Sequence, residues 1–201
     1  LNTLPKPLIG RVHGNVFGGG VGLVSVCDVA IGTQAVLMGL TETRIGLIPA
    51  TIGPYVCARM GEARARRVFM SGRRFGADEA VGLGLLAKSV ASALPDSVAD
   101  IASGTGSSTA AQTRLESALD LSVEAEIAPY LSCAPAAVAR AKALLRYLGP
   151  VIDEATIQHS IAELSACWAG TEAPEGIAAF FDKREPDWAA LGWGRSQSPQ
   201  N

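Results

Sequence analysis

The chain has 201 residues, 48% of them hydrophobic, which is enough for one domain with a sizeable buried core. A near balance of 17 Lys and Arg against 19 Asp and Glu gives a net charge of −2, which argues against nucleic acid as a partner. The 4 cysteines form no C-x-x-C pair, so neither a zinc site nor a disulfide framework is expected. No signal peptide and no apolar run of membrane length is seen, which predicts a cytoplasmic protein without a membrane partner.

The first part of the chain is predicted to alternate strands and helices around the three glycines Gly18, Gly19 and Gly20. Apolar residues indicate a strand over 7–12, a helix over 21–26 and a strand over 28–32. Glycines at a strand-to-helix junction either relieve close packing or expose a peptide N–H group toward a ligand. Three in succession exceed what packing usually requires, and a helix N-terminus favours an anion, so we favour the ligand-binding interpretation.

A single acid, Glu42, follows in an apolar stretch, as the only carboxylate between Asp28 and Glu62. A carboxyl group in apolar surroundings tends to have a raised pKa, which suits proton transfer near neutral pH. An exposed Glu42 paired with Arg44 fits the spacing equally well, and both interpretations remain open. Residues 37–43 are predicted to form a short strand or loop that presents Glu42, and 46–54 an irregular loop.

Beyond this loop the pattern predicts helices over 55–60, 63–70 and 77–83, and a strand over 85–90. Strands that alternate with helices favour an α/β layer architecture. A cluster of arginines is predicted to form a solvated helix face, with an anion-contacting face as the alternative. The cluster consists of Arg64, Arg66, Arg67, Arg73 and Arg74.

Composition divides the chain into an α/β core over 1–93, a flexible insertion over 94–121 that is rich in Ser, Gly and Thr, and a helical region over 122–191. In the helical region, apolar residues recur at helical spacing over 135–148, 150–168 and 175–181. The tail over 192–201 is polar and is predicted to be disordered.

Several short motifs occur in a fixed order along the chain. They are Lys6-Pro7, His13-Gly14, Gly18-Gly19-Gly20, Cys27-Asp28, Gly39-x-x-Glu42, Gly46-x-x-Pro49 and Ala77-x-Glu79-Ala80-x-x-x-Gly84-Leu85. In these motifs the chain resembles the enoyl-CoA hydratase/isomerase (crotonase) superfamily. The resemblance implies the α/β crotonase-like spiral of ββα units, truncated by about its N-terminal third, with C-terminal helices that pack between subunits in homotrimers or hexamers.

The resemblance also implies a chemistry and a set of site residues. The substrate would be an acyl-CoA thioester, with coenzyme A as part of the substrate and neither a separate cofactor nor a metal. Catalysis would use the Gly19 N–H as one oxyanion donor and Glu42 as the acid–base group. Substrate binding would involve Gly18, Gly20, Pro49 and Lys183, although an ordinary surface role for Lys183 is the stronger alternative. The loop that carries the second oxyanion donor in the family precedes the region matched here.

One departure from the family bears on the reaction. Hydratases of this family use two glutamates, and the earlier of the two positions is Gly22 in this chain. A similar glycine occurs in some hydratases of branched substrates such as 3-methylglutaconyl-CoA, so the resemblance favours hydration of a 2-enoyl-CoA, with a branched acyl group as one form of it. A Δ3-Δ2-enoyl-CoA isomerase that needs one base, and an inactive crotonase-like relic or assembly subunit, are the alternatives.

Overall fold

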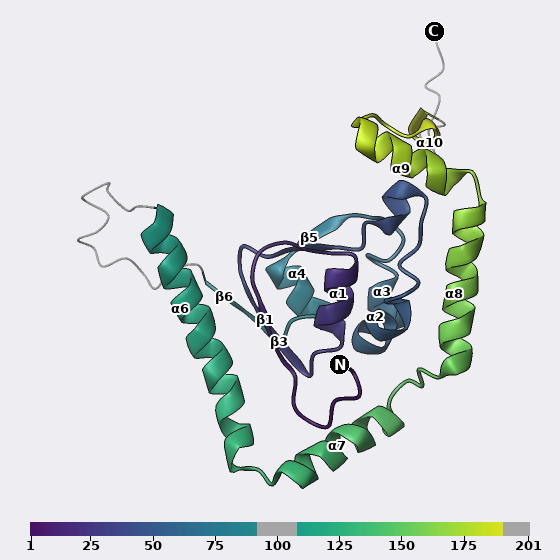
Figure 1. The fold of residues 1–201 in the computed structure, drawn as a ribbon. Helices are drawn as coiled ribbons and strands as arrows, with labels where there is room; N and C mark the ends of the chain where they lie inside the picture. The colour runs from purple at the N-terminus through teal and green to yellow at the C-terminus, as the bar shows by residue number, and fades with distance from the viewer. Residues whose placement is uncertain (92–107, 191–201) are drawn as a thin grey trace.

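The computed structural model describes residues 1–91 and 108–190, and the first of these ranges forms two small sheets and short helices (Figure 1). The strands are β1 (Ile9–Val12), β2 (Val16–Phe17), β3 (Val29–Thr33), β4 (Leu37–Gly39), β5 (Arg74–Gly76) and β6 (Lys88–Val90). The helices are α1 (Gly19–Ser25), the 3-10 helix η1 (Glu42–Ile45), α2 (Gly53–Met60), α3 (Glu62–Ala65) and α4 (Ala77–Gly82). The predicted α/β alternation is confirmed, but the short strands β2 and β5 were not expected from the apolar pattern.

The two sheets share one core and are joined by α1. In one sheet the order is β1-β3-β6, with all neighbours parallel. In the other the order is β2-β4-β5, where β2 is parallel and β5 antiparallel to β4. Helix α1 leaves the end of β2 and buries Val21 and Val24 in the core that both sheets line. The glycine turn before α1 is therefore held at the edge of a packed core, where burial of apolar surface fixes its position.

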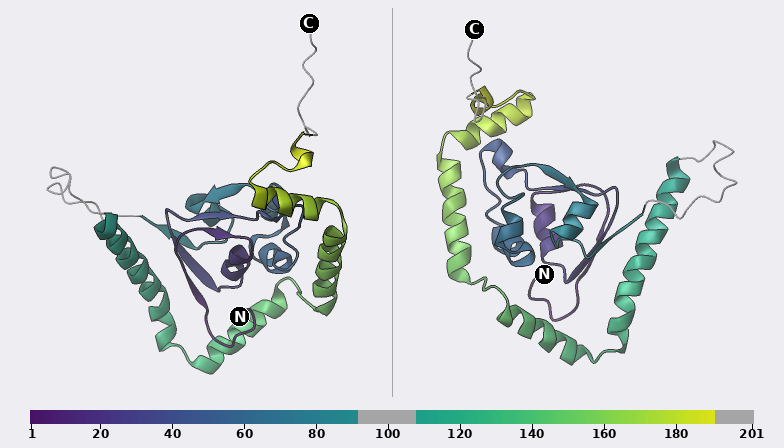
Figure 2. Two further views of the ribbon diagram at one scale, coloured as in Figure 1. Left: turned by 45° about the horizontal axis from the view of Figure 1, so that its top comes forward. Right: turned by 180° about the vertical axis from the view of Figure 1, so that it is seen from behind.

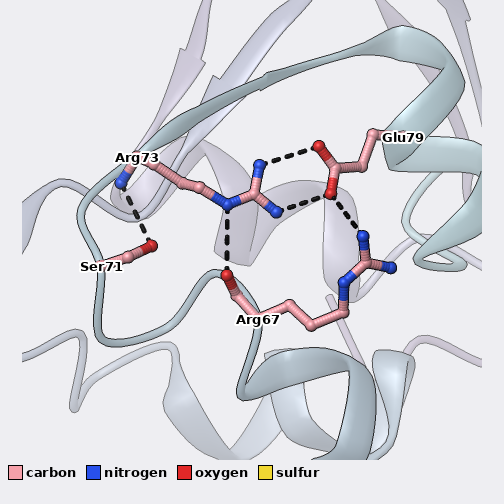
Figure 3. A network of polar contacts seen from close by, with 4 residues as sticks. All are labelled: Arg67, Ser71, Arg73 and Glu79. Carbon is pink, nitrogen blue, oxygen red and sulfur yellow. Dashed lines mark hydrogen bonds and ion pairs between the residues drawn. The ribbon is translucent and has the colours of Figure 1, made fainter.

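Two of the clustered arginines hold the junction between β5 and α4. Arg73 donates to both carboxylate oxygens of Glu79, at 2.6 and 2.8 Å, and Arg67 adds a third hydrogen bond at 3.1 Å (Figure 3). The hydrogen bond from Arg73 lowers the pKa of Glu79. The predicted single solvated helix face is therefore wrong, because Arg67 and Arg73 bind Glu79. Helix α3 ends at Ala65, and Arg74 lies in β5.

The remaining helices pass around this core in an arc (Figures 1 and 2). They are α6 (Ser108–Ile127), the 3-10 helix η2 (Ala128–Ser132), α7 (Pro135–Leu148), α8 (Glu154–Ala169), α9 (Glu172–Asp182) and α10 (Asp187–Ala190). The predicted flexible insertion over 94–121 is wrong for residues 108–121, because good helix formers extend α6 through them. Residues 94–107 of that insertion, and the tail over 192–201, lie outside the described residues.

Few side chains tie the arc to the core, and no described residue of α7 or α8 is buried. Lys142 of α7 bonds the Asp28 carboxylate at 2.7 Å and the Lys6 carbonyl at 3.0 Å. Large apolar side chains stay exposed along the arc. They include Leu144, Leu145, Tyr147, Leu148, Ile161, Trp168, Phe180 and Phe181. Such a surface suits contact with further protein, and the homotrimer or hexamer stays a prediction.

Helix α9 is the part of the arc that reaches the segment carrying Glu42. Its buried residues are small and face η1, and a Cβ on Gly176 would lie 2.5 Å from the carbonyl carbon of Ile45. In the same way, a Cβ on Gly46 would lie 2.5 Å from the backbone of Glu172. Backbone therefore packs directly on backbone, and the two glycines let α9 support η1 from outside.

We expect Gly176→Ala to lower the free energy of unfolding by about 1–3 kcal/mol, because the new methyl group has no room against Ile45. Helix propensity alone would predict the opposite sign, a gain of up to about 1 kcal/mol. Urea unfolding measures the difference. Gly82→Ala in α4 is the matched control, since nothing lies within 4 Å of its Cβ position. Stabilisation by both substitutions would contradict the close approach of α9.

Candidate functional site

The N-terminus of α1 presents a free peptide N–H group. Gly18 adopts φ 50°, a conformation that strains residues with a side chain, and its N–H donates to the Gly39 carbonyl at 3.0 Å. This bond ties the turn to β4. Gly19 begins the helix and is exposed, and no acceptor among the described residues binds its N–H. Gly20 is packed more tightly, because a Cβ there would lie 3.2 Å from Val16.

The carboxylate of Glu42 lies beside this turn. Its Oε1 is 3.2 Å from the position that a Cβ on Gly18 would take, so a side chain at position 18 would press on the acid. Oε2 is buried and has no hydrogen-bond partner among the described residues. Desolvation by burial raises the pKa of Glu42, against a smaller lowering by the N–H groups of Glu42 and Thr41. A raised pKa favours exchange of a proton near neutral pH.

The alternative that Arg44 neutralises Glu42 is not supported. Arg44 turns away and its Nε donates to the Gly72 carbonyl at 2.7 Å. No ion pair between Glu42 and a basic side chain is found in the part of the chain that the structure describes. Together, the acid and the free Gly19 amide form a site that can stabilise an oxyanion and move a proton next to it.

Ile52 packs against α1 one turn beyond the Gly19 amide. Ile52 is the N-cap of α2 and packs on the core. A Cβ on Gly22 would lie 2.3 Å from its Cγ2 and 2.8 Å from its Cβ. Position 22 therefore has no room for a side chain. The sequence shows Gly22 as an exception and a bulky residue at position 52, but only the fold shows that the two are in contact.

The other predicted site residues are placed less centrally. Pro49 is buried in the segment between η1 and α2, where the Ala50 N–H donates to the Ile48 carbonyl at 2.8 Å. Lys183 is exposed at the end of α9, and none of the described contacts joins it to the glycine turn. Their roles in substrate binding stay predictions.

The contact of Arg74 with Phe17 was missed by reasoning from the sequence, which placed Arg74 only in the arginine cluster. The guanidinium of Arg74 lies 5.1 Å from the centre of the Phe17 ring. Gly39 of β4 is paired with both residues, so its lack of a side chain lets the guanidinium reach across the strand. This contact braces the residue that immediately precedes Gly18. Pairing of Phe17 and Arg74 across a glycine could be found only once strand register is known.

Two cavities lie near these elements. One of about 340 Å³ is mainly apolar and lies between Thr51 and Pro54 on one side and Leu164 and Trp168 of α8 on the other. The larger, of about 750 Å³, lies at the far end of α1 next to Asp28, and neither cavity is lined by Gly19 or Glu42. No group of three or more His, Cys, Asp or Glu side chains within residues 1–91 and 108–190 could hold a metal ion. Among the helices of the same residues, none has the length and apolar character needed to cross a membrane.

The raised pKa of Glu42 predicts a pH-dependent stability. An acid whose pKa is higher in the folded than in the unfolded state binds its proton more tightly when folded, so its ionisation costs stability. This loss of stability is absent below the ordinary pKa of 4.5, which applies to the unfolded chain, and it reaches its full size above the pKa of the folded state. Glu42→Gln should therefore be more stable than the wild type at about pH 7, with a smaller difference at about pH 4. Urea unfolding at both pH values tests this, and an equal difference at both would contradict it.

Comparison with known proteins shows which family this chain resembles. A family model described as enoyl-CoA hydratase/isomerase matches residues 1–190. Methylglutaconyl-CoA hydratase, mitochondrial, of Rattus norvegicus is 30% identical over 189 residues, which cover 92% of this chain and 52% of that protein. The chain spans less than two thirds of the length of the curated relatives it matches.

Solved structures agree with the family model. The crystal structure of an enoyl-CoA hydratase from Mycobacterium avium is 26% identical, with a TM-score of 0.68 over 93% of this chain and 64% of that chain. An enoyl-CoA hydratase/isomerase from Marinobacter aquaeolei is 33% identical, with a TM-score of 0.59 over 94% and 62%. The fold is therefore the crotonase-like α/β fold with a helical C-terminal region, and the chain belongs to the enoyl-CoA hydratase/isomerase family.

Proposed function

We propose that this chain carries the acid–base half of a site that adds water to a 2-enoyl-CoA thioester. The observation that carries the proposal is the half-buried Glu42 carboxylate beside the glycine turn whose next residue, Gly19, offers a free N–H. A family model for enoyl-CoA hydratases and isomerases supports the acyl-CoA thioester as the substrate class. The chain spans only part of its relatives' length, so the complete activity is itself part of the proposal.

The proposed reaction follows from these two groups. The thioester oxygen accepts a hydrogen bond from the Gly19 N–H, and the dipole of α1 favours negative charge there. Glu42 takes a proton from water while the hydroxyl adds to C3, and the electron pair of the double bond moves through C2 to the thioester oxygen. The resulting enolate then takes the proton back from Glu42 at C2. One water is consumed, and the carboxylate is restored.

A branched acyl group such as 3-methylglutaconyl is the proposed form of the substrate. Similarity to the rat methylglutaconyl-CoA hydratase over most of this chain supports it.

Isomerisation of a 3-enoyl-CoA is the second candidate, and Gly22 is the observation that favours it. A hydratase of this family uses two carboxylates, whereas an isomerase needs one base to remove a proton from C2 and return it to C4. Position 22 cannot supply the second carboxylate, because Ile52 fills its space.

Parallel assays separate the candidates. With crotonyl-CoA and 3-methylglutaconyl-CoA, hydration is measured as loss of the conjugated double bond. With a 3-enoyl-CoA, isomerisation is measured as formation of a conjugated double bond. Faster turnover of the 2-enoyl substrates supports the hydratase, and faster turnover of the 3-enoyl substrate supports the isomerase. Absence of turnover with all three would reject both and favour a relic that only assembles.

Self-association is proposed on separate grounds. The apolar side chains exposed on α7, α8 and α9 would be covered in a homotrimer or hexamer. Light scattering coupled to gel filtration distinguishes the mass of a trimer or hexamer from that of a monomer. A monomer would contradict the proposal.

A further inference from the structure

One side chain, that of Ile52, covers the face of α1 that lies one turn beyond Gly19. Gly22 comes three residues after Gly19, so both lie on nearly the same side of the helix, about one turn apart. Ile52, the N-cap of α2, covers Gly22. The contact therefore lies just beyond the amide to which the proposed function assigns the thioester oxygen.

The contact is too close for any side chain at position 22. A Cβ added to Gly22 would lie 2.3 Å from the Ile52 Cγ2 and 2.8 Å from the Ile52 Cβ. Its distance to the Ile52 Cα would be 3.9 Å, an ordinary contact. Both colliding atoms therefore belong to the side chain of residue 52, and its backbone leaves enough room. Ala at position 52 would keep the contact at 2.8 Å, so only Gly at position 52 would make room at position 22.

We propose that Ile52 is a specificity-determining residue that restricts this site to one carboxylate. It places hydrocarbon where a side chain from position 22 would otherwise project, which leaves Glu42 to carry every proton transfer. This inference rests on the proposed function for its chemical meaning, whereas the steric coupling of residues 22 and 52 stands independently of it.

Stability measurements test the steric part. Gly22→Ala, Ile52→Gly and the double variant form a cycle whose urea midpoints are compared with that of the wild type. We expect Gly22→Ala to lower the midpoint strongly when Ile52 is present and much less in the Ile52→Gly chain. Gly82→Ala, which meets no neighbouring atom, should shift the midpoint equally in both backgrounds. Equal shifts for Gly22→Ala in both backgrounds would overturn the proposal.

Kinetics test the chemical part. In the Ile52→Gly chain, Gly22→Glu supplies a second carboxyl group, and Gly22→Gln fills the same space without an acid. We expect the Glu variant to hydrate crotonyl-CoA about tenfold faster than the Gln variant, at the low end of what a positioned acid–base group contributes. Its pH profile of kcat/KM should also gain a second ionisation that the wild type and the Gln variant lack.

Two results would overturn this part. One is identical rates and pH profiles for the Glu and Gln variants, and the other is a stable, fully active Gly22→Glu chain with Ile52 in place. Failure of the proposed function would look different: the wild type would turn over none of the acyl-CoA substrates, or Glu42→Gln would retain full activity, while the stability cycle at positions 22 and 52 remained non-additive.

Discussion

Glu42→Gln is expected to lower kcat for hydration of a 2-enoyl-CoA by about 10²–10⁴-fold, with KM close to that of the wild type. Glutamine has the same shape, but it cannot take a proton from water or return one to C2. The effect should be large because desolvation raises the pKa of Glu42 toward the pH at which a group exchanges protons most efficiently. Steady-state kinetics over a range of pH measure the loss.

Glu62→Gln is the matched control for this variant. Glu62 begins α3, and its carboxylate binds Arg66 at the exposed surface. Removal of that charge should leave kcat near the wild-type value, because exposed ion pairs contribute little. An equal loss in both variants, or full activity in Glu42→Gln, would show that Glu42 is not the acid–base group.

Gly19→Pro is expected to lower kcat by about 10²–10³-fold, the usual cost of losing one oxyanion donor. Proline removes the N–H and leaves α1 intact, since Gly19 is the first helical residue, where proline is well tolerated. Gly18 has no Cβ to clash with the proline ring, which removes one of the two clashes that restrict a residue before proline. Circular dichroism and urea unfolding would confirm that the helix persists while activity is lost.

Gly19→Ala provides the comparison that isolates the N–H. No atom lies within 4 Å of the Cβ position at Gly19, and its φ is not positive, so alanine fits and keeps the donor. The alanine variant should therefore keep much more of its kcat than the proline variant. Equal losses would attribute the effect to bulk in the substrate's path rather than to the missing hydrogen-bond donor.

The geometry beside Glu42 depends on segments that are distant in sequence. Helix α9 packs on η1 through Gly46 and Gly176, so the support for the acid comes from the C-terminal helices. On the opposite side, the Gly18 N–H binds the Gly39 carbonyl and holds the glycine turn against the strand that leads to Glu42. Changes in the C-terminal helices can therefore alter the position of Glu42 without any direct contact with it.

The sequence by itself determined the local features of this protein. The helix after the glycine turn, the strand over β3 and the helix α7 follow from apolar spacing and from glycine and proline at their ends, which act over a few residues. The glycine turn and Glu42 were likewise recognised as candidates from motifs alone. Short strands such as β2 were missed because a run of two residues has no periodicity.

Only the tertiary structure decided how these features meet. Whether Glu42 lay in apolar surroundings or was exposed and paired with Arg44 was open, since both fit the spacing, and packing of η1 against the turn and α9 decided it. The contact between Gly22 and Ile52 joins two helices, and the pairing of Arg73 with Glu79 joins a strand end to a helix. Such contacts depend on how elements pack in three dimensions, and the order of residues along the chain does not specify that packing locally.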